Sequence, residues 1–78
     1  MAETFENLGY FYVEVENDTG LCISVFSSSN PNEAGPTSGG TTIMSIPVYD
    51  DEYFLKYYID GNWYEDAEGT IPWTSSLL

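Results

Sequence analysis

Apolar and polar side chains alternate most clearly from Tyr10 to Glu16. Successive side chains of an extended strand point to opposite faces, so a period of two predicts a β-strand with one buried face. The buried face is predicted to carry Phe11, Val13 and Val15, and the opposite face Tyr12, Glu14 and Glu16.

The alternation stops at Asn17–Gly20 and resumes over Leu21–Ser27. Asn and Asp side chains bond to nearby backbone in turns, and glycine adopts positive φ, so Asn17–Gly20 has the chemistry of a tight connection. The two strands therefore predict an antiparallel hairpin. In the second strand we expect Leu21, Ile23 and Val25 to point inward, with Cys22, Ser24 and Phe26 on the other face.

Residues 27–40 form a Ser-, Gly- and Pro-rich segment without a large apolar side chain. A loop of this length is uncommon in a small domain and is usually functional or disordered. We interpret the segment as a flexible connection between two sheets, with a binding loop as the alternative.

The next strand is predicted over Thr41–Val48, with Pro47 at an edge or a strand end because proline has no N–H to donate. An acidic turn, Tyr49–Glu52, is predicted to follow it. The strongest local signal comes next, where strands predicted over Tyr53–Ile59 and Asn62–Ala67 flank a two-residue turn. That turn is Asp-Gly, a dipeptide that favours the type I′ hairpin geometry.

The turn at residues 60–61 also predicts the register of this second hairpin. It places Ile59 opposite Asn62, Tyr58 opposite Trp63, Tyr57 opposite Tyr64, and the only cation, Lys56, opposite Glu65. One face then carries Phe54, Tyr58, Trp63 and Ala67, and the other Tyr53, Leu55, Tyr57, Ile59 and Tyr64. Both faces are aromatic, so the pattern leaves open which one is buried. A short edge strand is predicted over Thr70–Thr74, and Ser75–Leu78 is predicted to be a tail.

These elements predict a single acidic β domain over residues 1–78. Hairpins at short spacing, with turn residues between them, are typical of antiparallel sandwiches and small barrels. We therefore expect an all-β fold: a small antiparallel β-sandwich or partly open barrel of about five to six strands built from hairpins.

Charge narrows the classes of function. The 78 residues include 13 Asp and Glu, one lysine, no arginine and no histidine, for a formal net charge of −12. Such a chain repels nucleic-acid backbones and anionic membranes, so we expect neither as a direct partner. Without histidine, and with a single cysteine, there is no His-based catalytic set and no Cys-rich zinc site, so we expect a non-enzyme without cofactor or metal.

Two local features could take part in metal binding or in thiol chemistry, namely the segment 60–62 and Cys22. Asp60, Gly61 and Asn62 begin like a calcium loop, but Tyr64 stands where a further oxygen ligand is needed, so solvated acidic turns are the preferred interpretation. Cys22 has no positive neighbour to stabilise a thiolate, so we expect a small buried filler. It also fits a reducing compartment, and Met1–Glu6 lacks the basic and apolar regions of a signal peptide, so an intracellular, cytoplasmic location is expected.

The remaining features favour a binding protein. Aromatic side chains are frequent at binding hot spots, although small β domains also use them for packing. An array of carboxylates serves solubility, or it complements a basic surface. The predicted partner-binding residues are Glu14, Glu16, Asp50, Asp51, Glu52, Glu65, Asp66 and Glu68, together with Tyr58, Trp63 and Tyr64.

Three functional hypotheses follow. In the first, the chain is an inhibitor or regulator, monomeric or weakly oligomeric, whose acidic surface blocks a basic site on a partner protein, such as a nucleic-acid-binding site. In composition it resembles small acidic phage-encoded inhibitors and DNA mimics. In the second, it binds carbohydrate or a lipid headgroup. Residues 13–25 resemble the opening hairpin of small cytosolic fungal lectin-like sandwiches, and Asp60, Asn62 and Trp63 would suit a sugar. In the third, it is a structural or assembly subunit.

The charge also makes a prediction about stability. Mutual repulsion of the carboxylates opposes the compact state, and dissolved salt screens repulsion between exposed charges. We expect the urea concentration at the unfolding midpoint to rise between about 10 mM and about 500 mM sodium chloride. An unchanged or lower midpoint at high salt would contradict this expectation.

Overall fold

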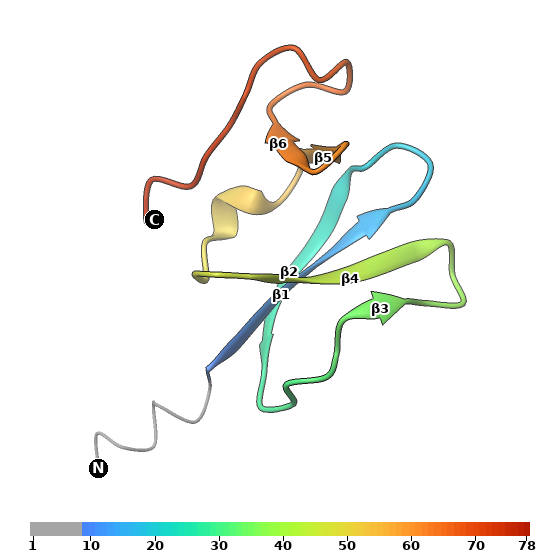
Figure 1. Ribbon diagram of the computed structural model, residues 1–78, viewed down its shortest axis with the longest axis vertical. Helices are drawn as coiled ribbons and strands as arrows, with labels where there is room; N and C mark the ends of the chain where they lie inside the picture. The colour runs from blue at the N-terminus through green and yellow to red at the C-terminus, as the bar shows by residue number, and fades with distance from the viewer. Residues whose placement is uncertain (1–8) are drawn as a thin grey trace.

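The computed structural model describes residues 9–78, so residues 1–8 of the predicted domain lie outside the described part. It is all-β, with one antiparallel sheet of four strands and one of two (Figure 1). In chain order the elements are β1 Tyr10–Glu16, β2 Cys22–Ser28, β3 Gly35–Pro36, β4 Thr41–Ile46, the 3₁₀ turn η1 Asp51–Tyr53, β5 Tyr57–Ile59 and β6 Asn62–Tyr64.

The larger sheet has the order β2-β1-β4-β3, with β1 paired antiparallel to both β2 and β4. The first strand and its hairpin with β2 are confirmed. The segment between β2 and β4 joins two strands of the same sheet, so its interpretation as a link between sheets was wrong. Because β2 and β4 lie on either side of β1, the chain must cross from one side of β1 to the other.

This crossing segment has a strand and defined hydrogen bonds where only a flexible loop was expected. The Tyr12 hydroxyl donates to the Asn30 carbonyl oxygen over 2.6 Å, and the Ser28 hydroxyl donates to Glu33 over 3.1 Å. Gly35 and Pro36 then pair with β4 as β3. Tyr12, predicted on the outer face, is only 2% exposed because the crossing segment bonds to its hydroxyl and Phe26 stacks on its ring at 5.5 Å.

A β-bulge reverses part of the predicted facing of β2. Glu14 pairs with Ser24 and Val15 pairs with Cys22, which leaves Ile23 as the extra residue. An extra residue of this kind interrupts the alternation, so side chains before and after it do not follow one period-two pattern, and Val25 faces the core as predicted. Cys22 is therefore fully buried against the core, whereas Ile23 is 37% exposed. The prediction that Ile23 points inward and Cys22 outward was wrong for this reason, which the alternation alone does not reveal.

The predicted strand over residues 53–59 is shorter in the structure. Asp50 caps η1, and Leu55 adopts φ +70°, which turns the chain before β5 begins. The three predicted pairs from Tyr57–Tyr64 to Ile59–Asn62 are confirmed. The ladder ends there, so Lys56 is not in register with Glu65. Its Nζ instead lies 5.1 Å from the centre of the Trp73 ring.

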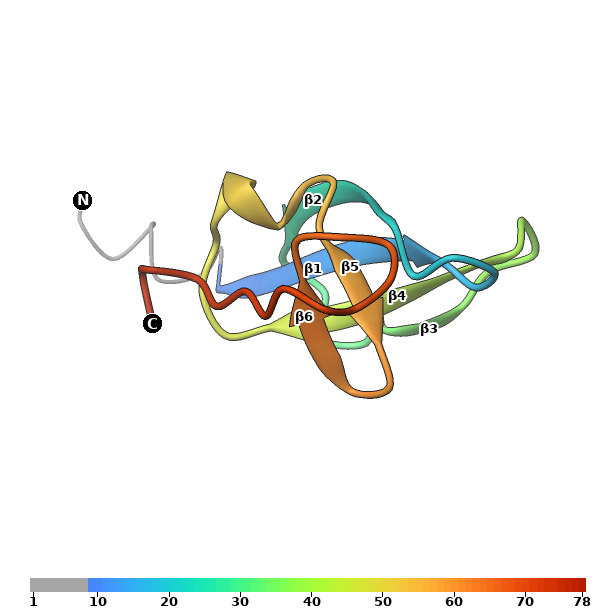
Figure 2. The ribbon, with the colours of Figure 1, turned by 90° about the horizontal axis from the view of Figure 1, so that it is seen from above.

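The β5–β6 hairpin is joined to the start of β2 and lies at that end of the larger sheet (Figure 1). In the view from above, the hairpin is seen in front of β1 and β4 (Figure 2). The Cys22 N–H donates to the Lys56 carbonyl over 2.8 Å, and the Tyr58 N–H donates to the Gly20 carbonyl over 2.8 Å. These bonds place Tyr58 and Trp63 against the core. The face of the β5–β6 hairpin that carries these two residues is therefore the buried one, a choice that the sequence pattern left open.

The C-terminal residues pack beside β6 and η1 (Figure 1). The Trp73 N–H donates to the Trp63 carbonyl over 3.0 Å, and Pro72 bridges to Tyr64, so the segment predicted as an edge strand does lie at the edge of β6. Ser75 is 4% exposed and donates its hydroxyl to Asp50. The prediction of a tail beginning at Ser75 was therefore wrong at that residue.

The core lies between the larger sheet and these later elements. Its buried members are Val13, Val15, Cys22, Ile46 and Tyr53. Around them pack half-buried apolar side chains from both sheets and the C-terminal segment, namely Phe11, Val25, Met44, Tyr58, Trp63 and Trp73.

The contact between the two sheets makes Gly20 a sensitive position. A Cβ there would lie 2.3 Å from the Tyr58 carbonyl oxygen, and φ is +80°. Gly40 has φ +81° with open space around a Cβ, so it serves as a matched control. We expect Gly40→Ala to lower the free energy of unfolding by about 1–2 kcal/mol through backbone strain alone. Gly20→Ala should cost clearly more in urea titration, and equal losses would contradict the proposed contact.

Candidate functional site

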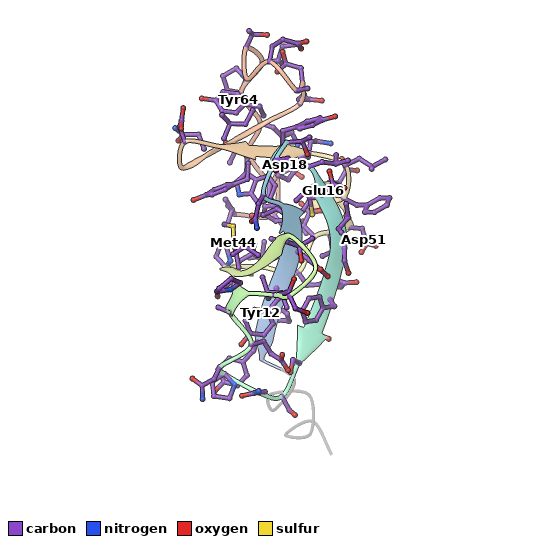
Figure 3. The ribbon with its side chains drawn as sticks, turned by 90° about the vertical axis from the view of Figure 1, so that its right-hand side faces the viewer. Tyr12, Glu16, Asp18, Met44, Asp51 and Tyr64 are labelled. Atoms are coloured by element: carbon purple, nitrogen blue, oxygen red, sulfur yellow. The ribbon has the colours of Figure 1, made fainter. Side chains whose placement is uncertain are left out.

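An open cleft of about 370 Å³ lies between the β1–β2 turn, β4 and the β5–β6 hairpin. Its floor is apolar and consists of Val15, Met44, Tyr58 and Ile59. Glu16, Asp18 and Asp60 contribute carboxylates to its lining. Figure 3 shows Glu16 and Asp18 where the larger sheet meets the small one. The cleft therefore combines an apolar surface with concentrated negative charge.

The β1–β2 turn is held by its own side chains. The Thr19 hydroxyl donates to the Glu16 carboxylate over 2.8 Å and accepts the Leu21 N–H over 3.1 Å. Asn17 accepts a 2.6 Å hydrogen bond from the Thr42 hydroxyl, which ties the turn to β4. These hydrogen bonds fix the conformation of the turn and thereby hold Glu16 in the lining of the cleft.

The other side of the cleft is formed by the β5–β6 turn. Asp60 has φ +52° and Gly61 has φ +88°, the two positive values that a type I′ turn requires. This turn projects Asp60 into solvent beside the cleft. Lys56, the only cation of the chain, is directed to Trp73 and is not among the residues that line the cleft.

Besides Glu16, which bonds to Thr19, three of the predicted partner-binding carboxylates accept hydrogen bonds within the fold. Asp50 is 6% exposed, caps η1 by accepting the Glu52 N–H over 2.9 Å, and accepts the Ser75 hydroxyl. Glu14 accepts the buried Thr41 hydroxyl over 2.6 Å. Asp66 accepts hydrogen bonds from the backbone N–H groups and the hydroxyl of the 70–71 segment.

The remaining predicted residues are dispersed. Glu16 and Tyr58 line the cleft, whereas Asp51, Glu52, Glu65 and Glu68 are exposed elsewhere. Trp63 and Tyr64 are half-buried in β6. The predicted sugar set does not come together as a platform, because the Trp63 ring packs between Tyr53 at 5.0 Å and Tyr58 at 5.1 Å, away from exposed Asn62.

Asp18 was not among the predicted site residues, because Asn17–Gly20 was interpreted only as a turn. The approach of this turn to Asp60 depends on how the small sheet docks. The nearest signal in the sequence was the presence of an acidic residue in each of the two predicted hairpin turns.

Two other groups were candidates for chemistry. Burial raises the pKa of the Cys22 thiol, which keeps it in the neutral form expected of a core residue. Within residues 9–78, no three Asp, Glu, Cys or His side chains are grouped so as to hold a metal ion.

Comparisons with protein-family models, curated proteins and solved structures found no match. In the part of the chain that the structure describes, no helix has the length and apolar character needed to cross a membrane. Function is therefore inferred from the geometry and charge of the molecule itself.

The Asp50–Ser75 contact generates a pH prediction. Hydrogen bonds from Ser75 and from the Glu52 N–H hold the pKa of Asp50 below its ordinary value of 3.8. A lowered pKa in the folded state means that this stabilisation is full above the unfolded-state pKa and is lost as pH falls through the folded-state pKa. We expect Ser75→Ala to lower the urea midpoint at pH 7, with a difference from the native chain that shrinks below about pH 3. A constant difference from pH 7 to about pH 2 would contradict the assignment.

Proposed function

We propose that this protein is a non-catalytic binding module that inhibits or regulates a partner protein by covering a basic site. A lysine or arginine side chain of the partner enters the cleft between the β1–β2 turn and the β5–β6 hairpin. A nucleic-acid-binding site is the kind of basic surface that such a module would block.

The observation that carries this proposal is the lining of the cleft. Glu16 at the end of β1, Asp18 in the β1–β2 turn and Asp60 in the β5–β6 turn line it together with the apolar residues Met44 and Tyr58. Lysine and arginine bury an alkyl stem against apolar surface and keep a charged head near carboxylates. A cation over the Tyr58 ring would gain further attraction from the π-system.

The charge of the whole molecule supports the same proposal. A net charge of −12 attracts a basic surface from a distance and speeds association, an effect that weakens as salt is added. The carboxylates outside the cleft, including Glu52, Glu65 and Glu68, contribute to this long-range field. Those inside it contribute short-range recognition as well.

Carbohydrate binding is the second candidate, and it is favoured by the amide and hydroxyl groups of Asn17 and Thr42 beside Tyr58 in the same cleft. Because Trp63 is not among the residues that line the cleft, Tyr58 would have to provide the stacking surface. A neutral sugar would bind without strong salt dependence, which separates it from a basic partner.

The test compares two immobilised variants that have the same net charge. Glu16→Gln, Asp18→Asn and Asp60→Asn together remove the cleft carboxylates, whereas Glu52→Gln, Glu65→Gln and Glu68→Gln remove three exposed ones elsewhere. We expect one basic protein to be retained by the native chain and by the second variant, to be lost from the first, and to elute as salt is raised. Added duplex DNA should compete for that protein if its nucleic-acid site is covered.

Equal retention by the two variants would show that only the overall charge matters and would overturn the role of the cleft. Failure to retain any basic protein at low salt, with the fold intact, would overturn the proposal. Quenching of the aromatic fluorescence by a glycan in a salt-independent manner would support the carbohydrate alternative.

A further inference from the structure

The two outer edges of the four-stranded sheet are protected to different degrees. The β3 edge has only two residues, one of which is Pro36. At the other edge, β2 is seven residues long. Its start is occupied, because the Cys22 N–H donates to Lys56 and the Leu55 N–H donates to the Cys22 carbonyl over 2.9 Å. Beyond that point, over residues 24–28, the described chain places no strand beside β2.

This free part of β2, which follows the bulge at Ile23, lacks the charged residues and the proline that often protect an edge strand. Residues 24–28 are Ser-Val-Phe-Ser-Ser, with no charged residue and no proline. Native proteins usually guard exposed edges with lysine, proline or a very short strand, because unpaired N–H and C=O groups accept another extended chain. The β3 edge follows that rule, whereas residues 24–28 do not.

An apolar groove of about 360 Å³ lies beside the same edge, between β2 and η1. Ile23 and Phe54 line it and are 37% and 48% exposed. The bulge accounts for the outward position of Ile23. Asp51 also lines the groove and lies on the β2 side of the molecule in Figure 3. The groove therefore offers apolar contact beside a carboxylate.

We propose that residues 24–28 of β2 bind an extended segment of a partner polypeptide as an added strand. An apolar side chain of that segment occupies the groove against Ile23 and Phe54, and a basic side chain lies beside Asp51. Strand addition takes affinity from main-chain hydrogen bonds and specificity from alternate side chains.

Charge decides between the possible occupants. A second copy of this chain would bring another net charge of −12 to the same edge and would be repelled. A basic segment is attracted by the same field, and its backbone satisfies the unpaired groups of the edge. This surface is separate from the cleft, so the inference does not depend on what the cleft binds.

The probe is a blocked decapeptide of alternating valine and lysine, mixed with the full chain at low salt. We expect backbone amide exchange in residues 24–28, followed by nuclear magnetic resonance, to slow when the peptide binds. The same peptide with its central amides N-methylated keeps its charge but loses main-chain donors, so it should bind at least about tenfold more weakly.

Matched substitutions locate the binding surface. Ser27→Lys places a guarding lysine on the edge, and Ser38→Lys makes the same charge change at an exposed position of the β3–β4 turn. Phe54→Ser removes a wall of the groove, and Ile71→Ser removes an exposed apolar side chain elsewhere. We expect the edge and groove variants to weaken peptide binding at least about tenfold and the two controls to change it by less than about threefold.

Three results would overturn the inference. The first is equal binding of the N-methylated peptide, and the second is loss of binding in the cleft variant but not in Ser27→Lys. The third is a concentration-dependent dimer of the native chain that Ser27→Lys abolishes, because a second copy would then occupy the edge. Failure of the strand inference leaves the cleft proposal standing, since that proposal is tested by different substitutions.

Discussion

The packing of one tyrosine ring joins most of this small molecule. Tyr53 is 3% exposed and meets the rings of Trp63 and Trp73 edge-on, at 5.0 and 4.9 Å between ring centres. These three residues come from η1, from β6 and from the C-terminal segment, so two ring contacts made by Tyr53 connect all three elements to the sheet core. Edge-to-face rings of this kind bury large apolar areas in a defined geometry. A domain of this size buries a limited fraction of its surface, and a few rings therefore carry much of its packing.

This packing also decides what the acidic residues do. Docking of η1 and the C-terminal segment brings Ser75 to Asp50, which becomes a buried cap, and the loop after β6 closes around Asp66. Those carboxylates stabilise the fold. By contrast, the approach of two turns brings Glu16, Asp18 and Asp60 to one cleft. The tertiary structure thus places some acidic side chains in hydrogen bonds that hold the fold together and others at the cleft.

The cleft and the free edge of β2 share a common origin in the way the small sheet docks. Residues 55–58 bond to Gly20 in the β1–β2 turn and, within β2, only to its first residue, Cys22. The contact of residues 55–58 with the β1–β2 turn forms one side of the cleft. No described strand pairs with β2 beyond that contact, so the edge at residues 24–28 stays open. Binding at either surface would suit a positively charged partner, because both lie in the field of the same net negative charge.

Local patterns determined much of the secondary structure. Period-two alternation located β1 to the residue, and Asp60-Gly61 determined the register of β5 and β6, because side-chain facing and type I′ geometry depend on neighbouring residues alone. Composition determined the charge and the absence of histidine chemistry. The bulge at Ile23, the turn at Leu55 and the buried state of Asp50 came from tertiary structure, since each depends on segments distant in sequence. The cleft was decided in the same way: its carboxylates meet only after the small sheet pairs with the start of β2, a contact that no local pattern specifies.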